Sequence, residues 1–231
     1  MKQNYLTRYG FSTLTIVSGF LMLYEIYLVF MVVPNERLMG PVQRIFYFHV
    51  GAAMACYCAA AVILIGSLGY LALRDARFDI LMQAASEVAF LFAAMVMSSG
   101  MIWGHAAWNT WFRWEPRLVT FLILLLIFLG LILLRVFGDK TKLPEHCAVL
   151  GILGAITVPI VVFSIQLLPS MAQLHPQVVG NRGLRDPLFY EAMFVGMAAM
   201  IIFQFQLIWL RYKIGLLETR KLQEIQTYSQ P

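Results

Sequence analysis

The sequence predicts an all-α membrane protein, a bundle of six transmembrane helices, and three observations support this fold class. Of the 231 residues, 61% are hydrophobic and only 13% are charged, with a mean hydropathy of +0.76. Soluble domains are nearer half apolar and a quarter charged. Six apolar runs are each long enough to cross a bilayer as a helix. The connections between them are short and polar, which leaves no room for a separate soluble domain.

The first three spans are expected at Phe11–Val33, Ile45–Leu73 and Ile80–Trp103. The first span follows a polar N-terminus that carries Lys2 and Arg8. Because no small-residue cleavage site comes after it, we expect a retained helix and not a removed signal peptide. The second span has small residues at helical spacing, which permits close contact with a neighbouring helix.

The last three spans are expected at Leu118–Leu134, Cys147–Leu168 and Leu188–Leu210. Pro159 lies inside the fifth span, where it removes one helical hydrogen bond and is expected to kink the helix. The segment after the sixth span is charged. We expect it to form a tail outside the bilayer, with at most a short surface helix.

The distribution of lysine and arginine predicts the orientation. Eleven of these residues lie on the side that holds both termini, and six lie on the other side. Because the richer side faces the cytoplasm, both termini are expected inside. Residues 1–212 then form the transmembrane domain and residues 213–231 a cytoplasmic tail. The net charge of +5 is attributed to contact with membrane lipid, since no long basic run suggests nucleic-acid binding.

The outer connection after the third span, at about 103–118, is rich in tryptophan. It holds four of the five tryptophans of the chain: Trp103, Trp108, Trp111 and Trp114. If this segment is helical, Trp108, Trp111 and Phe112 share one face. The alternative is an aromatic belt, because tryptophan favours the membrane interface. A belt spreads its aromatics over many helix ends, so we favour a flat apolar shelf for a large planar ligand.

Two histidines are predicted on the same side as this shelf. His49 lies near the outer end of the second span, and His175 lies in the third outer connection. Each one alone is more simply explained as a structural residue, but neutral imidazole is also the usual nitrogen ligand of haem iron. The other two histidines, His105 and His146, are weaker candidates. Among the outer arginines, which suit carboxylates, Arg117 stands out because it is close to Glu115.

The run W-G-x3-W-x2-W-x2-W-E-x-R-L, which begins at Trp103 and Gly104, resembles the tryptophan-rich "WWD" signature of haem-handling membrane proteins. With His49 before it and His175 after it, the chain is most similar to the CcmC-type branch. Three positions depart from the usual pattern. Glu115 replaces an aspartate, Phe112 replaces a tryptophan and Asn109 replaces a glycine.

The resemblance implies that His49 and His175 are the axial ligands of a transiently held haem b. It also implies that the signature residues bind the cofactor: Trp103, Gly104, Trp108, Trp111, Trp114, Glu115 and Arg117. A multi-pass protein of the bacterial inner membrane would then deliver haem to a periplasmic CcmE-like chaperone. Its membrane partners would be CcmA/CcmB-like transporter subunits and a small CcmD-like subunit.

Three other functions remain open at this stage: a haem permease subunit, a CcsA-like synthase component and, with less support, a b-type electron carrier. An enzyme finds little support, because no activated serine, cysteine or carboxylate pair is evident. Three carboxylates lie inside spans: Glu25, Glu87 and Glu191. Since a charge facing lipid is costly, we expect all three to face the interior of the bundle.

Overall fold

The structure is a computed structural model that describes residues 5–37, 39–139, 141–168 and 186–228. Its described part contains six α-helices: α1 (Tyr5–Tyr27), α2 (Arg44–Leu73), α3 (Ala76–Trp108), α4 (Pro116–Phe137), α5 (Leu143–Leu167) and α6 (Pro187–Tyr228). A turn of π-helix, Leu28–Val32, extends α1, and a 3₁₀ turn, Pro41–Gln43, precedes α2. All six helices are long and apolar enough to cross a membrane, which confirms the predicted fold class.

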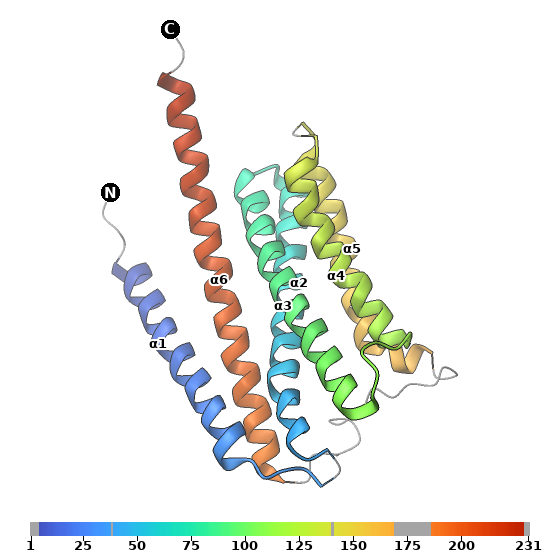
Figure 1. Ribbon diagram of the computed structural model, residues 1–231. Helices are drawn as coiled ribbons and strands as arrows, with labels where there is room; N and C mark the ends of the chain where they lie inside the picture. Colours follow the sequence, from blue (N-terminus) through green and yellow to red (C-terminus); the bar gives the residue numbers. More distant parts are fainter. Residues whose placement is uncertain (1–4, 38, 140, 169–185, 229–231) are drawn as a thin grey trace.

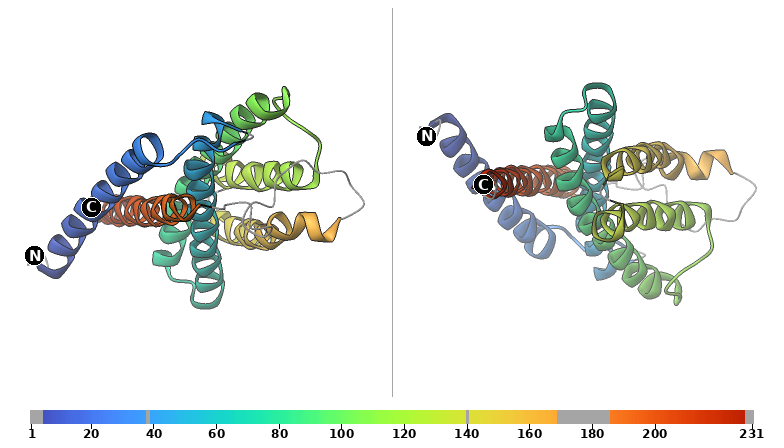
Figure 2. Two further views of the ribbon diagram at one scale, coloured as in Figure 1. Left: turned by 90° about the horizontal axis from the view of Figure 1, so that it is seen from below. Right: turned by 90° about the horizontal axis from the view of Figure 1, so that it is seen from above.

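The helices form three side-by-side groups, with α1 and α6 on one side, α2 and α3 in the centre, and α4 and α5 on the other side (Figures 1 and 2). Helix α2 packs against α3, α5 and α6, whereas α1 contacts only α6 among the described α-helices. The beginning of α1 and the end of α6 lie at one end of the bundle. The connection between α3 and α4 lies at the opposite end (Figure 1).

A tight turn joins the two central helices. Arg74 ends α2 in the left-handed conformation, with φ 55°, and its backbone N–H bonds to the carbonyl of Tyr70. Asp75 then caps α3 by accepting a 2.8 Å hydrogen bond from the backbone N–H of Arg77. Hydrogen bonds from the side chain and backbone of Arg77 hold the pKa of Asp75 below its ordinary value. The cap thus fixes the start of the helix that carries the tryptophan-rich segment.

Small residues bring α2 close to α6. A Cβ atom on Gly51 would lie only 2.9 Å from the carbonyl oxygen of Gly196 in α6. One and two turns along the same face of α2, Ala55 and Ala59 are fully buried. This confirms the predicted small-residue contact, and glycine is required at Gly51 because a backbone atom occupies the space of its side chain.

Two helices extend further than the apolar runs predicted. Helix α3 continues to Trp108, five residues beyond the expected end of the third span at Trp103. Helix α6 continues from the expected end at Leu210 to Tyr228, so the segment expected to be a separate tail continues the last helix. Hydropathy indicates where contact with lipid ends. A helix ends where a residue leaves the helical backbone conformation. Asn109, in the left-handed conformation, is that residue for α3.

The carboxylates inside the spans have different environments. Glu25 in α1 is 1% exposed, and neither of its oxygens has a hydrogen-bond partner among the described residues. Glu87 pairs with Arg211 of α6, with Nε and Oε2 2.6 Å apart. Glu191 is exposed and accepts a 2.8 Å hydrogen bond from the hydroxyl of Tyr24. The expectation of an interior position is therefore confirmed for Glu25 and holds in part for Glu87, while Glu191 lies at the surface between α1 and α6.

Candidate haem-binding site

His49 lies in the second turn of α2 and faces α3. Its Nδ1 atom is 2.9 Å from the hydroxyl oxygen of Ser99, which is hydrogen-bonding distance. The next residue, Gly100, provides the space for the ring, because a Cβ atom there would lie 3.1 Å from Cε1 of His49. The backbone carbonyl of Val96, also in α3, is a second hydrogen-bond partner of the ring. Helix α3 therefore holds the imidazole through two polar groups, the hydroxyl of Ser99 and the carbonyl of Val96.

The last turns of α3 hold the first part of the tryptophan-rich segment. Trp103 follows Ser99 by four residues, so it lies one turn further along the same face of α3. Its ring packs edge-to-face against Trp108, with centroids 4.7 Å apart and planes at 81°. His105 stacks flat on Trp111, with centroids 4.1 Å apart and planes at 5°. The two pairs connect the end of the helix to the chain that follows it.

The rest of the segment is not helical, so the face predicted from the spacing of Trp108, Trp111 and Phe112 does not form. Helix α3 ends at Trp108, and the backbone N–H of Asn109 bonds to the carbonyl of His105. The aromatic surface is built by ring pairs across this chain reversal and not by one helix face. It includes an edge-to-face pair of Phe112 and Trp114 with centroids 5.3 Å apart.

Two tryptophans present apolar surface outside the packed core, since Trp111 is 54% exposed and Trp114 is 80% exposed. Gly104 is buried beneath the reversal, where a Cβ atom would make only ordinary contacts, the nearest at 3.4 Å to the carbonyl oxygen of Thr110. The position therefore favours a small residue without strictly requiring glycine. The tryptophan-rich segment therefore has a buried part at Gly104 and exposed rings at Trp111 and Trp114.

The charged end of the segment is anchored to neighbouring elements. Glu115 is 3% exposed, and its Oε1 atom lies 3.6 Å from Nε of Arg113. Pro116 begins α4 at a position where its missing N–H costs nothing. Arg117 donates a 2.8 Å hydrogen bond from Nη2 to the backbone carbonyl of Val162 in α5. Arg117 thus ties the beginning of α4 to α5, and Glu115 pairs with Arg113 inside the connection, where the half-exposed Arg113 remains accessible to an anionic group.

His175, the second histidine predicted to bind haem iron, lies outside the described residues. Its role as a second axial ligand therefore stays a prediction.

Neither Ser99 nor Gly100 is predicted as a site residue from the sequence, and His105 is only a weaker candidate than His49. The consecutive small residues Ser98, Ser99 and Gly100, near the outer end of an apolar helix, were the available signal. Two buried nitrogens in this region, Nε1 of Trp103 and Nδ1 of His105, have no hydrogen-bond partner among the described residues. Unpartnered buried donors are uncommon, and they suit a site that also binds polar groups of a ligand.

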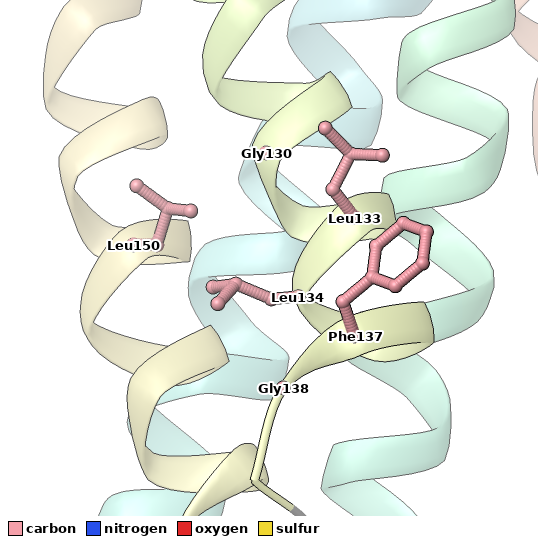
Figure 3. Close-up of a pocket in the computed structure, with 6 residues that line it drawn as sticks. All are labelled: Gly130, Leu133, Leu134, Phe137, Gly138 and Leu150. Carbon is pink, nitrogen blue, oxygen red and sulfur yellow. The ribbon is translucent and has the colours of Figure 1, made fainter.

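These residues fit the three parts of a haem molecule. The imidazole of His49 suits iron, the aromatic surface suits the apolar macrocycle, and Arg113 suits a propionate. By contrast, the hollow between α4 and α5 (Figure 3) is lined only by apolar residues and glycines: Gly130, Leu133, Leu134, Phe137, Gly138 and Leu150. It lies at the far end of α4 from the tryptophan-rich segment, and no histidine lines it.

A six-helix membrane bundle with an imidazole and a tryptophan-rich surface at one end is the architecture of a haem-handling membrane protein. The comparison with protein families agrees with this class. The family model of CcmC, heme exporter protein C, matches residues 3–227. The chain therefore belongs to the CcmC family.

Individual relatives are similar over part of their length. Heme exporter protein C of Bradyrhizobium diazoefficiens is 34% identical over 133 residues, which cover 57% of this chain and 51% of that protein. The heme exporter protein C of Escherichia coli (strain K12) is 31% identical over 137 residues, covering 58% and 55%. A putative cytochrome c biosynthesis ccmC-like mitochondrial protein of Marchantia polymorpha is 30% identical over 146 residues, covering 63% and 62%. The matched part of the chain thus spans 51% to 62% of the length of these three relatives.

Proposed function

We propose that this protein holds haem at the outer membrane face and delivers it to a periplasmic haem chaperone for cytochrome c maturation. The observation that carries the proposal is the environment of His49. Its ring extends from α2 against α3, with Nδ1 2.9 Å from the hydroxyl of Ser99 and with the backbone carbonyl of Val96 as a second partner. A neutral imidazole in this arrangement is a ready ligand for haem iron. The names of the family and of the relatives given above support the same function.

Each part of the site has a defined task in this proposal. His49, and His175 from the connection between α5 and α6, would hold the haem iron through their imidazole nitrogens. The signature residues contact the macrocycle through the exposed rings of Trp111 and Trp114. Arg113 binds a propionate, while Glu115 and Arg117 hold the connection in place. Bound haem would supply the iron that these histidines hold, and in this proposal the protein performs no turnover of its own.

The exposure of the tryptophan surface favours delivery over permanent retention. A b-type electron carrier keeps its haem between facing helices, whereas Trp111 and Trp114 lie largely exposed beyond the end of α3. A transiently held haem b at such a surface can be approached by an acceptor protein. This geometry is the reason we place the electron-carrier function behind haem delivery.

The membrane setting follows from charge and topology. The beginning of α1 and the end of α6 lie at one end of the bundle, and that side has the larger number of lysines and arginines. We therefore propose that both termini face the cytoplasm of a bacterium and that the tryptophan-rich end faces the periplasm. The proposed partners are a CcmE-like chaperone as acceptor, CcmA/CcmB-like transporter subunits and a CcmD-like subunit.

Absorption spectra of the detergent-purified protein test the proposal. Wild type is compared with His49→Ala, His175→Ala and the control His146→Ala, each with and without a reductant, after titration with haem. His146 lies near the beginning of α5, at the other end of the bundle. We expect the Soret band of the first two variants to weaken or shift, and that of the control to match wild type.

Two outcomes contradict the proposal. Equal haem content in all four proteins excludes the histidines as ligands. If the wild-type protein takes up no haem even when haem is added, this chain does not bind haem by itself. In that case the tryptophan-rich segment is better explained as an interfacial belt.

A further inference from the structure

We propose that Ser99 is a positioning residue that holds His49 in the tautomer whose Nε2 is unprotonated and able to bind a metal. The inference rests on the proposed function, because the role of Ser99 is to hold one proposed haem ligand in its binding form before haem binds. The tautomer itself is a property of the protein without haem. It can therefore be measured whether or not haem binds.

The hydrogen bonds of Ser99 define its role. Its hydroxyl has one proton and lies near three acceptors or potential acceptors. These are the carbonyl oxygen of Met95 at 2.7 Å, the carbonyl oxygen of Val96 at 3.2 Å and Nδ1 of His49 at 2.9 Å. Serine in a helix commonly donates to the carbonyl four residues earlier, and here that contact is the shortest. The proton is thereby directed to Met95, and the oxygen of Ser99 accepts a hydrogen bond from Nδ1–H of His49.

The opposite tautomer is less well satisfied. If Ser99 donated to an unprotonated Nδ1, the proton of the imidazole would lie on Nε2. Ser99 would then no longer donate to the carbonyl of Met95, which is its shortest contact. The ring also contacts the carbonyl of Val96, which can only accept and lies 3.2 Å from the same hydroxyl, so this carbonyl also favours a protonated ring nitrogen on the side of α3. Histidines that bind metals usually donate their other N–H in this way.

Packing confines the ring at the same place. The absence of a side chain at Gly100 lets the edge of the imidazole approach α3, with Cε1 3.1 Å from where a Cβ atom would lie. His49 comes two residues before Gly51, where α2 lies against α6. Since both flanking contacts involve glycine and backbone, the position of His49 relative to Ser99 is fixed by helix packing and not by a flexible connection.

The chain provides a matched control in the adjacent serine. The hydroxyl of Ser98 donates to the carbonyl of Ala94 at 2.8 Å and has no contact with His49. Ser98→Ala therefore removes one helical serine hydroxyl without touching the imidazole. Ser99→Ala removes the side-chain partner of His49 and leaves the carbonyl of Val96, whereas Ser99→Thr keeps a hydroxyl in its place.

The first measurement is ¹⁵N NMR of the haem-free protein labelled at its histidine imidazoles, at about pH 8, well above the ordinary pKa of histidine. Protonated and unprotonated imidazole nitrogens resonate in separate ranges, and the signals of His49 are identified by their loss in His49→Gln. We expect protonated Nδ1 and unprotonated Nε2 in wild type, Ser98→Ala and Ser99→Thr. In Ser99→Ala we expect a mixture of tautomers. A protonated Nε2 in wild type, or an unchanged spectrum in Ser99→Ala, overturns the inference.

The second measurement is haem titration of the same variants. Loss of a hydrogen-bond partner of a metal-binding histidine typically weakens metal affinity about 10-fold to 100-fold. We expect a loss in that range for Ser99→Ala, wild-type affinity for Ser98→Ala and partial recovery for Ser99→Thr. If the tautomer changes as expected while His49→Ala binds haem like wild type, the proposed function fails and the NMR result still stands. If His49→Ala loses haem while Ser99→Ala does not, the positioning role fails and the proposed function stands.

Discussion

The contact between Gly100 and His49 predicts that an alanine at position 100 affects stability and haem binding differently. Replacing glycine with alanine inside a helix stabilises it by about 0.5–1 kcal/mol. The new Cβ atom would lie 3.1 Å from Cε1 of His49, so the ring has to move by a few tenths of an ångström. An off-rotamer side chain costs about 0.5–1.5 kcal/mol. The two terms are similar in size, so the stability of Gly100→Ala is expected within about 1 kcal/mol of wild type.

The effect of the same change on haem binding has no such compensation. Any movement of the ring changes the 2.9 Å contact between Nδ1 and the oxygen of Ser99. It also moves Nε2, the atom proposed to bind iron. Because losing this contact altogether is expected to weaken affinity at least 10-fold, a displacement should weaken it by several-fold, up to about 10-fold. Haem titration followed at the Soret band measures this effect.

The matched control is Gly19→Ala in α1, where a new Cβ atom meets nothing within 4 Å. We expect a gain of about 0.5–1 kcal/mol from helix propensity and unchanged haem affinity. Stability is measured by unfolding in mixed detergent micelles with increasing denaturing detergent. If Gly100→Ala binds haem like wild type, the imidazole has room to move and the confinement argument is refuted. If Gly100→Ala lost several kcal/mol of stability, the new Cβ atom would be clashing with backbone and not only with the ring.

Three further predictions concern the frame that holds the site. Gly51→Ala is expected to destabilise the bundle by about 1–3 kcal/mol, because its Cβ atom would meet the backbone of α6 at 2.9 Å; wild-type stability in detergent unfolding would refute this. Arg135→Gln is expected to cost about 3 kcal/mol, since it leaves the mostly buried Asp79 without its partner at 2.5 Å. Adding Asp79→Asn should then recover part of that loss, and no recovery would count against the pairing. Asp75→Asn should lower stability at neutral pH, and the difference from wild type should shrink below about pH 3.8, because a depressed pKa contributes stability only above the titration range. Unfolding at pH 7 and at about pH 3 compares the two proteins, and a pH-independent difference would exclude this contribution of Asp75.

The number and type of the helices could be predicted from the sequence because apolar length alone decides membrane spanning. Their ends could not be predicted in the same way. The residues that follow Trp103 are compatible with a helix until Asn109, so α3 continues past the apolar run. The polar residues that follow Leu210 likewise continue α6, and Arg211 at that boundary pairs with Glu87. A segment that looks like a free tail thus contributes a contact to the bundle.

The residue types of the site could be predicted from the sequence, but their arrangement in space could not. The tryptophan cluster and His49 were visible in the sequence. The spacing of Trp111 and Phe112, however, suggested a helix face that does not exist, because the chain reverses at Asn109. The stack of His105 on Trp111 and the contact of His49 with Ser99 depend on that reversal and on the packing of α2 against α3. Such contacts join distant segments, and no local pattern specifies them.

The candidate site has one part on the helix pair α2 and α3 and another on the connection at 109–115. This division limits how haem could leave the proposed site. His49 lies on α2, which packs against three other helices, so its position is tied to the core of the bundle. The connection at 109–115 is also held at both ends, by the capping contact of Asn109 and by the hydrogen bond from Arg117 to α5. The exposed rings of Trp111 and Trp114 are therefore carried on a fixed frame. In the proposed function, an acceptor protein would approach this exposed surface itself, since neither the helix pair nor this connection is built to swing outward.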